Sequence, residues 1–362
     1  MRAPLEREPS VSAAPGLDAW TRDELARSFG DRTRLDEPMA RHTSFRIGGP
    51  ADVWVQVESA EELSRVAKIL ARATVPVFVL GSGTNILVSD RGIRGVVVHL
   101  GPGFSFLEWK ASGDETEVRA GAALAFKKVV AAAVRRGLTG LEFAEGIPGS
   151  LGGGLTMNAG AFGGEIGRVV LDLEGVHRDG RIETIPRDRL PFEYRRLDLP
   201  AGFVITAVRM HLRRGVDDEI RERVANARGK RKKAQPLGLP NAGSIFKNPK
   251  GTFAGRLLEE AGLKGRTVGG ARVSDRHANF IVNAGGATAA DVRALMREMA
   301  DVVSARTGVA LEPEIKLVGD FDHPPGVARP PEGVLDHPPD FVRPGVCDAS
   351  ASETTPLPKG VK

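Results

Sequence analysis

The residues best suited to chemistry begin with a glycine-rich run at 146–165, GIPGSLGGGLTMNAGAFGGE. Apolar residues alternate with its glycines, unlike in a flexible linker, which is rich in glycine and serine throughout. Glycine lets the backbone adopt positive φ or approach another group closely. Backbone amides gathered in this way form a concave site for anions. We therefore expect the run to hold a large cofactor that carries phosphate.

A second glycine-rich segment, GSGTNILVSD at residues 81–90, follows an apolar stretch expected to be a buried strand. Ile86 stands where a Rossmann fingerprint needs its third glycine, so that interpretation is weak. The chain also lacks the Gly-Lys-Ser/Thr ending of a P-loop. One such loop alone is usually a tight turn. Two glycine-rich loops favour a dinucleotide held between them.

Ser244, in the segment NAGSIFKNP, is the candidate for proton transfer. The segment lacks the second glycine of a nucleophile elbow, so the serine is either a turn residue or a proton donor. A serine hydroxyl is a weak acid and would need cationic neighbours, for which Lys247 and Arg195 are candidates. Arg195, in EYRR, could hold a carboxylate or phosphate through a bidentate pair, or it could form a surface salt bridge.

The segment LEPEIKLVG at residues 311–319 alternates apolar and polar residues as a strand does. Alternation would place Glu312, Glu314 and Lys316 on one face of this strand. From the strand alone, a solvent-facing polar stripe is the favoured interpretation.

Composition excludes several classes of protein. The chain has 362 residues, 41% of them hydrophobic and 27% charged, as in an ordinary globular protein with room for two or three domains. No apolar stretch approaches the roughly 20 residues that span a bilayer, and the N-terminal segment lacks the apolar core of a secretory signal. The only cysteine, Cys347, lies in a Pro-rich tail. We therefore expect no membrane insertion, no intrachain disulfide and a cytoplasmic location.

Residue spacing and charge indicate whether the protein binds a metal or a nucleic acid. No set of His, Cys and carboxylate residues has metal-ligand spacing, so we expect no metal. The net charge is +5, and the only dense basic cluster lies at residues 228–233 with few aromatic residues beside it. Base-stacking platforms are therefore not evident, and attraction of an anionic substrate is favoured over nucleic-acid binding.

Periodicity predicts the elements that position these residues. Strands and helices together indicate an α+β domain at 37–212, after a leader with a short helix at 1–36. A second domain is expected at 213–320 and a disordered Pro-rich tail at 321–362. The expected helices are 17–29 with Asp18 as N-cap, one after the N-cap Ser59 with Glu62 at the capping-box position, 124–136, one starting near 216, 254–261 and 289–307. The expected strands are 51–57, 75–80, 95–100, 115–120, a hairpin turning at Asp179-Gly180, 203–212, 278–283 and 311–319.

Taken together, these segments resemble the UDP-N-acetylenolpyruvoylglucosamine reductases, flavoenzymes of peptidoglycan precursor synthesis. The resemblance covers roughly residues 36–319, and the motifs occur in the family's order. They are HTSFRIGGPADVWV, GSGTNILVSD, GIPGSLGGGLTMNAGAFGGE, EYR, NAGSIFKNP, DRHANFIVN and LEPEIKLVG. The resemblance implies an FAD-binding domain of the vanillyl-alcohol-oxidase type followed by a smaller α+β substrate-binding domain. It also implies noncovalent FAD, reduction by NADPH, and a UDP-sugar enol ether as substrate.

The same resemblance implies roles for individual residues. Ser244 would donate the proton, and Arg195 and Glu314 would stabilise the enolate-like intermediate. Asn248 and either Lys232 or Lys233 would contact the UDP-sugar. The FAD would be held by Gly81, Ser82, Gly83, Thr84 and Asn85, by Gly146, Ile147, Pro148, Gly149 and Ser150, and by Asn158, Ala159 and Gly160.

The chain departs from many relatives in two places. Leu197 stands where they carry Ser or Thr two residues after the arginine, and no inserted module with a tyrosine precedes NAGSIFKNP. The chain therefore resembles the shorter subtype. Two alternatives remain at this point. One is another FAD enzyme of the superfamily, an oxidase of a sugar or alcohol, and the other is a nucleic-acid-binding module built on residues 228–233.

Overall fold

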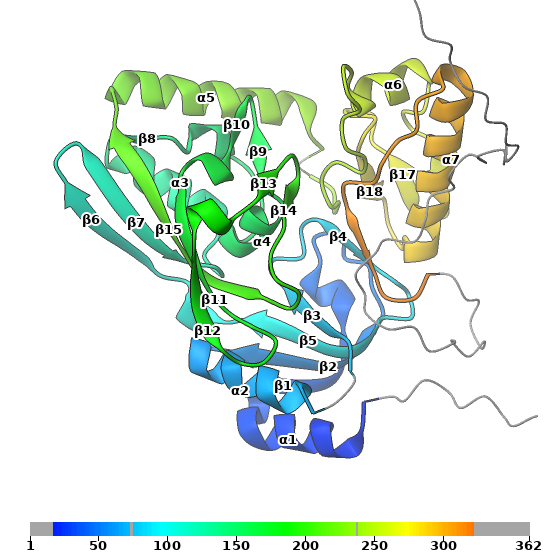
Figure 1. The fold of residues 1–362 in the computed structure, drawn as a ribbon. Coiled ribbons are helices and arrows are strands. Elements are labelled where there is room, and N and C mark those ends of the chain that lie inside the picture. Colours follow the sequence, from blue (N-terminus) through cyan, green and yellow to red (C-terminus); the bar gives the residue numbers. More distant parts are fainter. Residues whose placement is uncertain (1–16, 73–74, 237, 322–362) are drawn as a thin grey trace, which may run out of the picture. The chain divides into compact units, whose positions relative to one another are not determined.

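The computed structural model describes residues 17–72, 75–236 and 238–321 (Figure 1). The expectations for residues 1–16, for the Pro-rich tail from residue 322 onward and for Cys347 lie outside the described residues. The helices of the described part are α1 (Ala19–Phe29), α2 (Ala60–Leu70), α3 (Phe126–Arg135), α4 (Leu151–Thr156), α5 (Asp217–Ala234), α6 (Ala254–Glu260) and α7 (Ala289–Thr307).

The strands of the described residues form three sheets and three short pairs. The first sheet has the order β1 (Thr33–Pro38), β2 (Pro50–Val57), β5 (Ile93–Leu100) and β3 (Val77–Leu80). The second sheet has the order β12 (Ile182–Pro186), β11 (Val170–Val176), β15 (Val204–Arg214), β7 (Glu115–Gly121) and β6 (Leu107–Ser112), with β8 (Leu138–Thr139) beside β15. The third sheet is β16 (Thr267–Val268), β17 (Ala271–Val273) and β18 (Ile281–Asn283). The pairs are β9 (Gly160–Ala161) with β10 (Gly164–Glu165), β13 (Phe192–Glu193) with β14 (Arg196–Leu197), and β4 (Ile86–Val88) with β19 (Lys316–Val318).

The first sheet carries α1 and α2, whose starts follow the predicted caps. Asp18 accepts a hydrogen bond from the Thr21 amide, and Ser59 accepts one from the Glu62 amide. The Glu62 carboxylate does not return the bond to Ser59. It accepts from the Glu58 amide at 2.8 Å and pairs with Arg32 instead, so the capping box is only half formed.

The prediction that the strand at residues 75–80 is buried is wrong. β3 lies at the edge of the first sheet and pairs only with β5. Val77 and Val79 are 45% and 38% exposed. A continuous apolar run resembles a central strand in sequence, but only the sheet order decides whether a second neighbour covers it.

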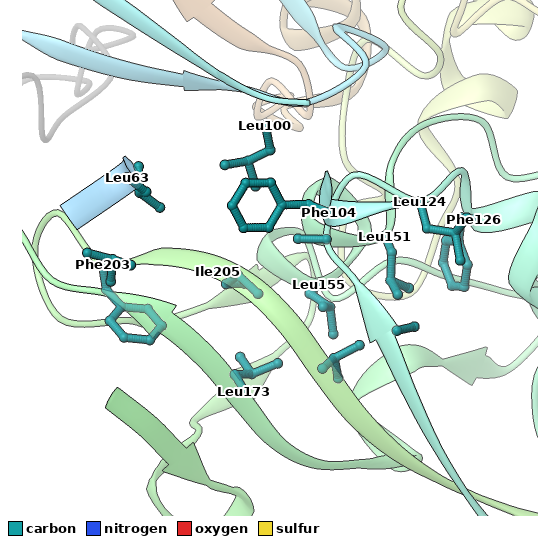
Figure 2. Packing of buried hydrophobic residues seen from close by; sticks show 14 of the residues in the cluster. Leu63, Leu100, Phe104, Leu124, Phe126, Leu151, Leu155, Leu173, Phe203 and Ile205 are labelled. Atoms are coloured by element: carbon teal, nitrogen blue, oxygen red, sulfur yellow. The ribbon is translucent and has the colours of Figure 1, made fainter. Parts of the chain in front are cut away.

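The second sheet packs its apolar face against α3 and α4 in one large core (Figure 2). Four of the buried residues of α3 follow the spacing of one helical face: Phe126, Val129, Val130 and Ala133. Figure 2 shows Leu124 and Leu151 near Phe126 in this core, with Leu155 nearer to Ile205. The hairpin of β11 and β12 turns at Gly180, whose φ of 87° suits glycine, as the Asp179-Gly180 turn predicted.

A second core lies around α7, α6 and the third sheet. Val292, Met296 and Met299 of α7 are fully buried, with the spacing of an amphipathic helix. Phe45 and Ile47, from the early segment HTSFRIGG, are buried in this same cluster together with Leu87 of β4. Residues far apart in sequence therefore share one core.

The predicted strand at 311–319 is regular only from Lys316 to Val318. β19 runs parallel to β4 there, while Pro313 forms an isolated bridge with Phe246. Proline lacks a backbone N–H and interrupts a ladder. The expectation that Glu312, Glu314 and Lys316 form one exposed stripe is therefore wrong: Glu312 is 70% exposed, whereas Glu314 is 16% exposed.

No helix in residues 17–72, 75–236 and 238–321 has the length and apolar character needed to cross a bilayer.

Asp90 links the end of GSGTNILVSD to the start of α7. Its two carboxylate oxygens accept from the Ala289 and Ala290 amides at 2.8 and 2.9 Å. A carboxylate at a helix N-terminus satisfies unpaired amides and opposes the helix dipole. Asp90→Ala is expected to lower the free energy of unfolding by about 1–2 kcal/mol. Urea denaturation measures this; the control Asp301→Ala, at an exposed position within α7, should change it little.

Candidate active site

The two glycine-rich loops that the sequence singled out lie against each other. A Cβ atom added at Gly81 would lie 2.5 Å from Ser150 Oγ, and one added at Gly149 would lie 2.7 Å from Thr84 Oγ1. Gly149 also has a φ of 111°, which L side chains rarely adopt. The close approach of these loops therefore requires glycine at 149, and a side chain at position 81 would require Ser150 to move.

The loop at residues 81–85 offers free donors. Within the described chain, the backbone N–H groups of Ser82, Gly83 and Thr84 hydrogen bond to no other protein group. The Gly83 carbonyl, by contrast, accepts from both the backbone amide and the hydroxyl of Ser44. Successive unpaired amides in a glycine-rich loop are suited to phosphate oxygens. The two loops thus form a cradle for a phosphate-bearing ligand.

Asn158 and Gly160, predicted to lie beside the cofactor, hold the hairpin that carries Arg195. The buried Asn158 side chain donates to the Glu193 carbonyl at 2.9 Å, and its carbonyl oxygen accepts from the Gly167 amide at 3.1 Å. Arg195 Nη1 donates to the Gly160 carbonyl at 2.9 Å. Arg195 itself has a φ of 58°, a left-handed conformation that is costly outside glycine. Several contacts thus fix this arginine in a strained turn between β13 and β14.

Arg195 meets Glu314 although 118 residues separate them. Nε of Arg195 lies 2.9 Å from Oε1 of Glu314, an ion pair without the alignment of a linear hydrogen bond. Burial raises the pKa of the Glu314 carboxyl, and the positive charge of Arg195 opposes this rise. The pair is therefore mostly desolvated, where a charge acts on its neighbours more strongly than it does in water.

Glu314 also lies beside the glycine-rich loop at residues 81–85 and next to the segment that carries Ser244. Its carbonyl accepts from the Asn85 side chain at 3.2 Å, and its amide donates to the Ile245 carbonyl at 2.7 Å. Ser244 directly precedes Ile245. The backbone thus brings Ser244, Glu314 and Arg195 into one region next to the loop at residues 81–85.

Ser244 opens into a cleft of about 540 Å³ that Asn248 also lines. The carbonyl oxygen of the Asn248 side chain accepts from the Ala254 amide at 3.1 Å, which leaves its N–H₂ group available. Lys247, one of the two cations proposed to assist Ser244, pairs instead with Glu312. Of the two candidate lysines, both exposed, Lys232 lines a neighbouring cleft and Lys233 lines neither cleft.

Arg231, which the sequence analysis did not select individually, lies against the glycine-rich run: a Cβ atom added at Gly146 would lie 2.9 Å from its Cδ. Its Nε is occluded and has no hydrogen-bond partner among the described residues, and its guanidinium lies 5.5 Å from the ring centre of Phe162. Burial lowers the pKa of Arg231, and the charge of Arg195 lowers it further. A buried cation that faces another cation is suited to an anionic ligand.

A signal in the sequence could have identified Arg231. The buried residues of α5 are Ile220, Val224 and Ala227. Arg231 follows Ala227 by four residues, so it continues the same helical face. Ion pairs of Arg223 with Glu142 and of Arg228 with Glu145 hold this face against the residues just before the glycine-rich run.

No group of three or more His, Cys, Asp and Glu residues able to hold a metal occurs in the described part of the chain.

Two family models match the chain. An FAD binding domain matches residues 51–186, and the C-terminal domain of UDP-N-acetylenolpyruvoylglucosamine reductase matches residues 235–318. The chain is 44% identical to the UDP-N-acetylenolpyruvoylglucosamine reductase of Agathobacter rectalis over 298 residues, which are 79% of this chain and 94% of that protein. The chain belongs to the UDP-N-acetylenolpyruvoylglucosamine reductase family.

Other members of the family agree. UDP-N-acetylenolpyruvoylglucosamine reductase 2 of Symbiobacterium thermophilum is 46% identical, over 80% of this chain and 92% of its own. The crystal structure of the Thermus caldophilus reductase is similar with a TM-score of 0.69 and 38% identity, over 79% of this chain and 98% of that one. The expected architecture, an FAD-binding domain followed by a smaller α+β domain, is confirmed. The chain is an FAD-dependent oxidoreductase, and the matches do not favour the oxidase alternative.

The geometry fits FAD as the family's cofactor. FAD carries a pyrophosphate, and the loops at residues 81–85 and 146–150 combine unpaired amides with close glycine packing.

Proposed function

We propose that the chain catalyses NADPH-dependent reduction of UDP-N-acetylglucosamine enolpyruvate to UDP-N-acetylmuramate, a step of peptidoglycan precursor synthesis in the cytoplasm. The main support for this proposal is the ion pair between Arg195 and Glu314. The Glu314 amide donates to the carbonyl of Ile245, the residue that follows Ser244. This arrangement brings a charge pair to a candidate proton donor beside the glycine-rich cradle. Family membership supports the substrate class.

FAD would be held by residues 81–85 and 146–150, with residues 158–160 alongside. When bound, FAD would supply the hydride-transfer chemistry between NADPH and the enolpyruvyl double bond. The polypeptide would supply the rest of the reaction. In the same proposal the chain has two domains, at residues 37–212 and 213–320. The first would hold the cofactor, and the second would hold most of the substrate.

Ser244 would give the proton. As the hydride adds to one carbon of the double bond, electrons move toward the substrate carboxylate, and the Ser244 hydroxyl protonates the adjacent carbon. The product gains two hydrogens and becomes the lactyl ether. The serine must then recover a proton from solvent before the next turnover.

Arg195 would stabilise the charge that develops on the substrate carboxylate, since a preorganised cation in a desolvated site acts strongly on such charge. Glu314 would hold Arg195 in place through their ion pair. Asn248 and either Lys232 or Lys233 would contact the UDP-sugar. The basic cluster at residues 228–233 would serve these anionic ligands rather than nucleic acid.

Product analysis tests the proposal. The FAD-loaded protein is incubated with NADPH and UDP-N-acetylglucosamine enolpyruvate, and the sugar nucleotide is analysed by mass spectrometry. We expect one NADPH consumed for each product molecule that has gained two hydrogens. Hydrogen peroxide formation without change in the sugar nucleotide would contradict the proposal.

NADPH and the UDP-sugar are expected to occupy the same cleft in turn. Both carry phosphates, and both must reach one flavin. Initial rates at several fixed NADPH concentrations should therefore give parallel double-reciprocal plots, and each ligand in excess should inhibit competitively against the other. Intersecting plots, which indicate simultaneous binding, would exclude a shared cleft.

A further inference from the structure

The backbone around Ser244 lies between α5 and α6, where the described chain forms no strand and Phe246 makes an isolated bridge with Pro313. Ile245 and Phe246, which follow Ser244, are both fully buried. Buried backbone groups outside a regular ladder must find their hydrogen-bond partners elsewhere. The groups that supply these partners therefore fix where Ser244 lies.

Asn279 supplies three of the partners. Its side-chain oxygen accepts from the Phe246 amide at 2.9 Å, and its side-chain nitrogen donates to the Phe246 carbonyl at 2.8 Å. Its backbone carbonyl accepts from the Ile245 amide at 2.9 Å. The side-chain amide thus takes the place of the peptide group that a neighbouring strand would offer, because asparagine carries both a donor and an acceptor.

Asn279 is itself held firmly. It is 2% exposed and lies in the turn between β17 and β18. Its amide donates to Nδ1 of His277 at 3.2 Å, and the Phe280 carbonyl accepts from the Ser274 amide at 2.8 Å in the same turn. A side chain that is locked in this way can hold a functional segment in a fixed geometry.

The contacts of Ile245 connect Asn279 with the charge pair of the site. The Ile245 amide bonds to Asn279, and the Ile245 carbonyl bonds to the Glu314 amide. Glu314 in turn forms the ion pair with Arg195. Asn279, which lines the same cleft as Ser244, therefore helps to set the position of the serine relative to this pair.

We propose that Asn279 is a positioning residue for Ser244. It acts through the serine, by holding the backbone of residues 245–246 so that the Ser244 hydroxyl lies where the proton is needed. The proposal rests on the proposed function, in which Ser244 is the proton donor. A displacement of about 1 Å in such a group can slow a reaction by about 10²-fold.

Asn279→Asp tests the proposal with little change in side-chain size. The carboxylate keeps an acceptor for the Phe246 amide but has no N–H for the Phe246 carbonyl. In anaerobic stopped-flow measurements on the FAD-loaded protein, we expect reoxidation by saturating UDP-N-acetylglucosamine enolpyruvate to slow by about 10–10²-fold. Flavin reduction by NADPH, and the affinity for UDP measured by calorimetry, should stay nearly unchanged. General damage to the fold would instead change all three.

The double variant separates positioning from a structural role. In Ser244→Ala protein, Asn279→Asp should add no further slowing, because no hydroxyl is left to position. Asn283→Asp is the matched control, since that side chain also bonds to backbone on two sides, to the Phe45 carbonyl and the Gly285 amide, and lines neither cleft. Its reoxidation rate should match that of the original protein. The original rate in Asn279→Asp, or equal slowing with and without the Ser244 hydroxyl, would overturn the proposal.

Crystal structures of the FAD-loaded original protein and of Asn279→Asp give a readout without turnover. We expect the Ser244 hydroxyl to be displaced by about 1 Å, with Asn248 in its original place. An unmoved Ser244 would overturn the proposal. An original protein whose reduced flavin is not reoxidised by the UDP-sugar would contradict only the proposed function, and the structures would still decide the role of Asn279. If Asn279→Asp does not retain FAD, Asn279→Gln, which carries both polar groups one methylene further out, takes its place with the same expectations.

Discussion

Ser244→Ala is expected to slow reduction of the UDP-sugar by about 10²–10⁴-fold, the contribution typical of a positioned general acid. Reduction of the bound flavin by NADPH should continue at nearly the original rate, because that half-reaction needs no proton from Ser244. The serine lies in the cleft with Asn248 and directly precedes the residue that bonds to Glu314. Its loss therefore removes a hydroxyl without removing a contact that holds the site.

Stopped-flow absorbance separates the two half-reactions. Flavin reduction is followed after mixing with NADPH, and reoxidation is followed after mixing the reduced protein with the UDP-sugar. Ser244→Cys, which restores a proton-bearing group, should recover part of the second rate. Ser304→Ala, at an exposed serine of α7, serves as the control. Reoxidation by the UDP-sugar at the original rate in Ser244→Ala would remove the serine's role as donor.

Glu314→Gln is expected to slow the same half-reaction by about 10²-fold, as when one preorganised electrostatic contact is lost. The amide has no charge to hold Arg195 in its strained turn, so the guanidinium would be less well positioned toward the substrate carboxylate. FAD binding should change little, because the glycine loops supply those contacts. Glu312→Gln is a matched control two residues away, since Glu312 is exposed and pairs with Lys247 instead.

The pH profile gives an independent readout of Glu314. Its pKa is raised by burial, so the carboxylate takes up a proton at a higher pH than an ordinary glutamate, and the ion pair with Arg195 weakens at that point. As the pH is lowered, activity of the original protein should therefore begin to fall before the pH reaches 4.5, the ordinary pKa of a glutamate carboxyl. Glu314→Gln has no such group and should lack this acidic limb. A lower affinity for FAD with an unchanged reoxidation rate would instead indicate a structural role.

Local features of the fold were predictable because they depend on nearby residues. The bounds of α7 match the predicted helix at 289–307, and Asp18 caps α1 as its spacing indicated. The exposure of β3 was not predictable, since it depends on which strand lies beside it. The irregular strand at residues 311–319 could have been predicted from Pro313, because proline interrupts a ladder, but the alternation of apolar and polar residues alone did not indicate it.

The site depended on long-range contacts. No spacing rule relates Arg195 to Glu314. The resemblance to the family implied a shared role for them, and their ion pair was found only in the structure. Arg231 lies among several other cations, so charge alone did not distinguish it. Its position on the same helical face as Ile220, Val224 and Ala227 would have done so. The close approach of the two glycine-rich loops was predictable, because such an approach favours glycine, and the glycines are visible in the sequence.

An anaerobic absorbance titration tests the central claim most directly. The purified protein, loaded with FAD, is reduced with NADPH and then mixed with UDP-N-acetylglucosamine enolpyruvate in the absence of oxygen. We predict that the flavin spectrum bleaches with NADPH and returns in full with the UDP-sugar. A reduced flavin that is restored only by oxygen, and not by the UDP-sugar, would contradict the account.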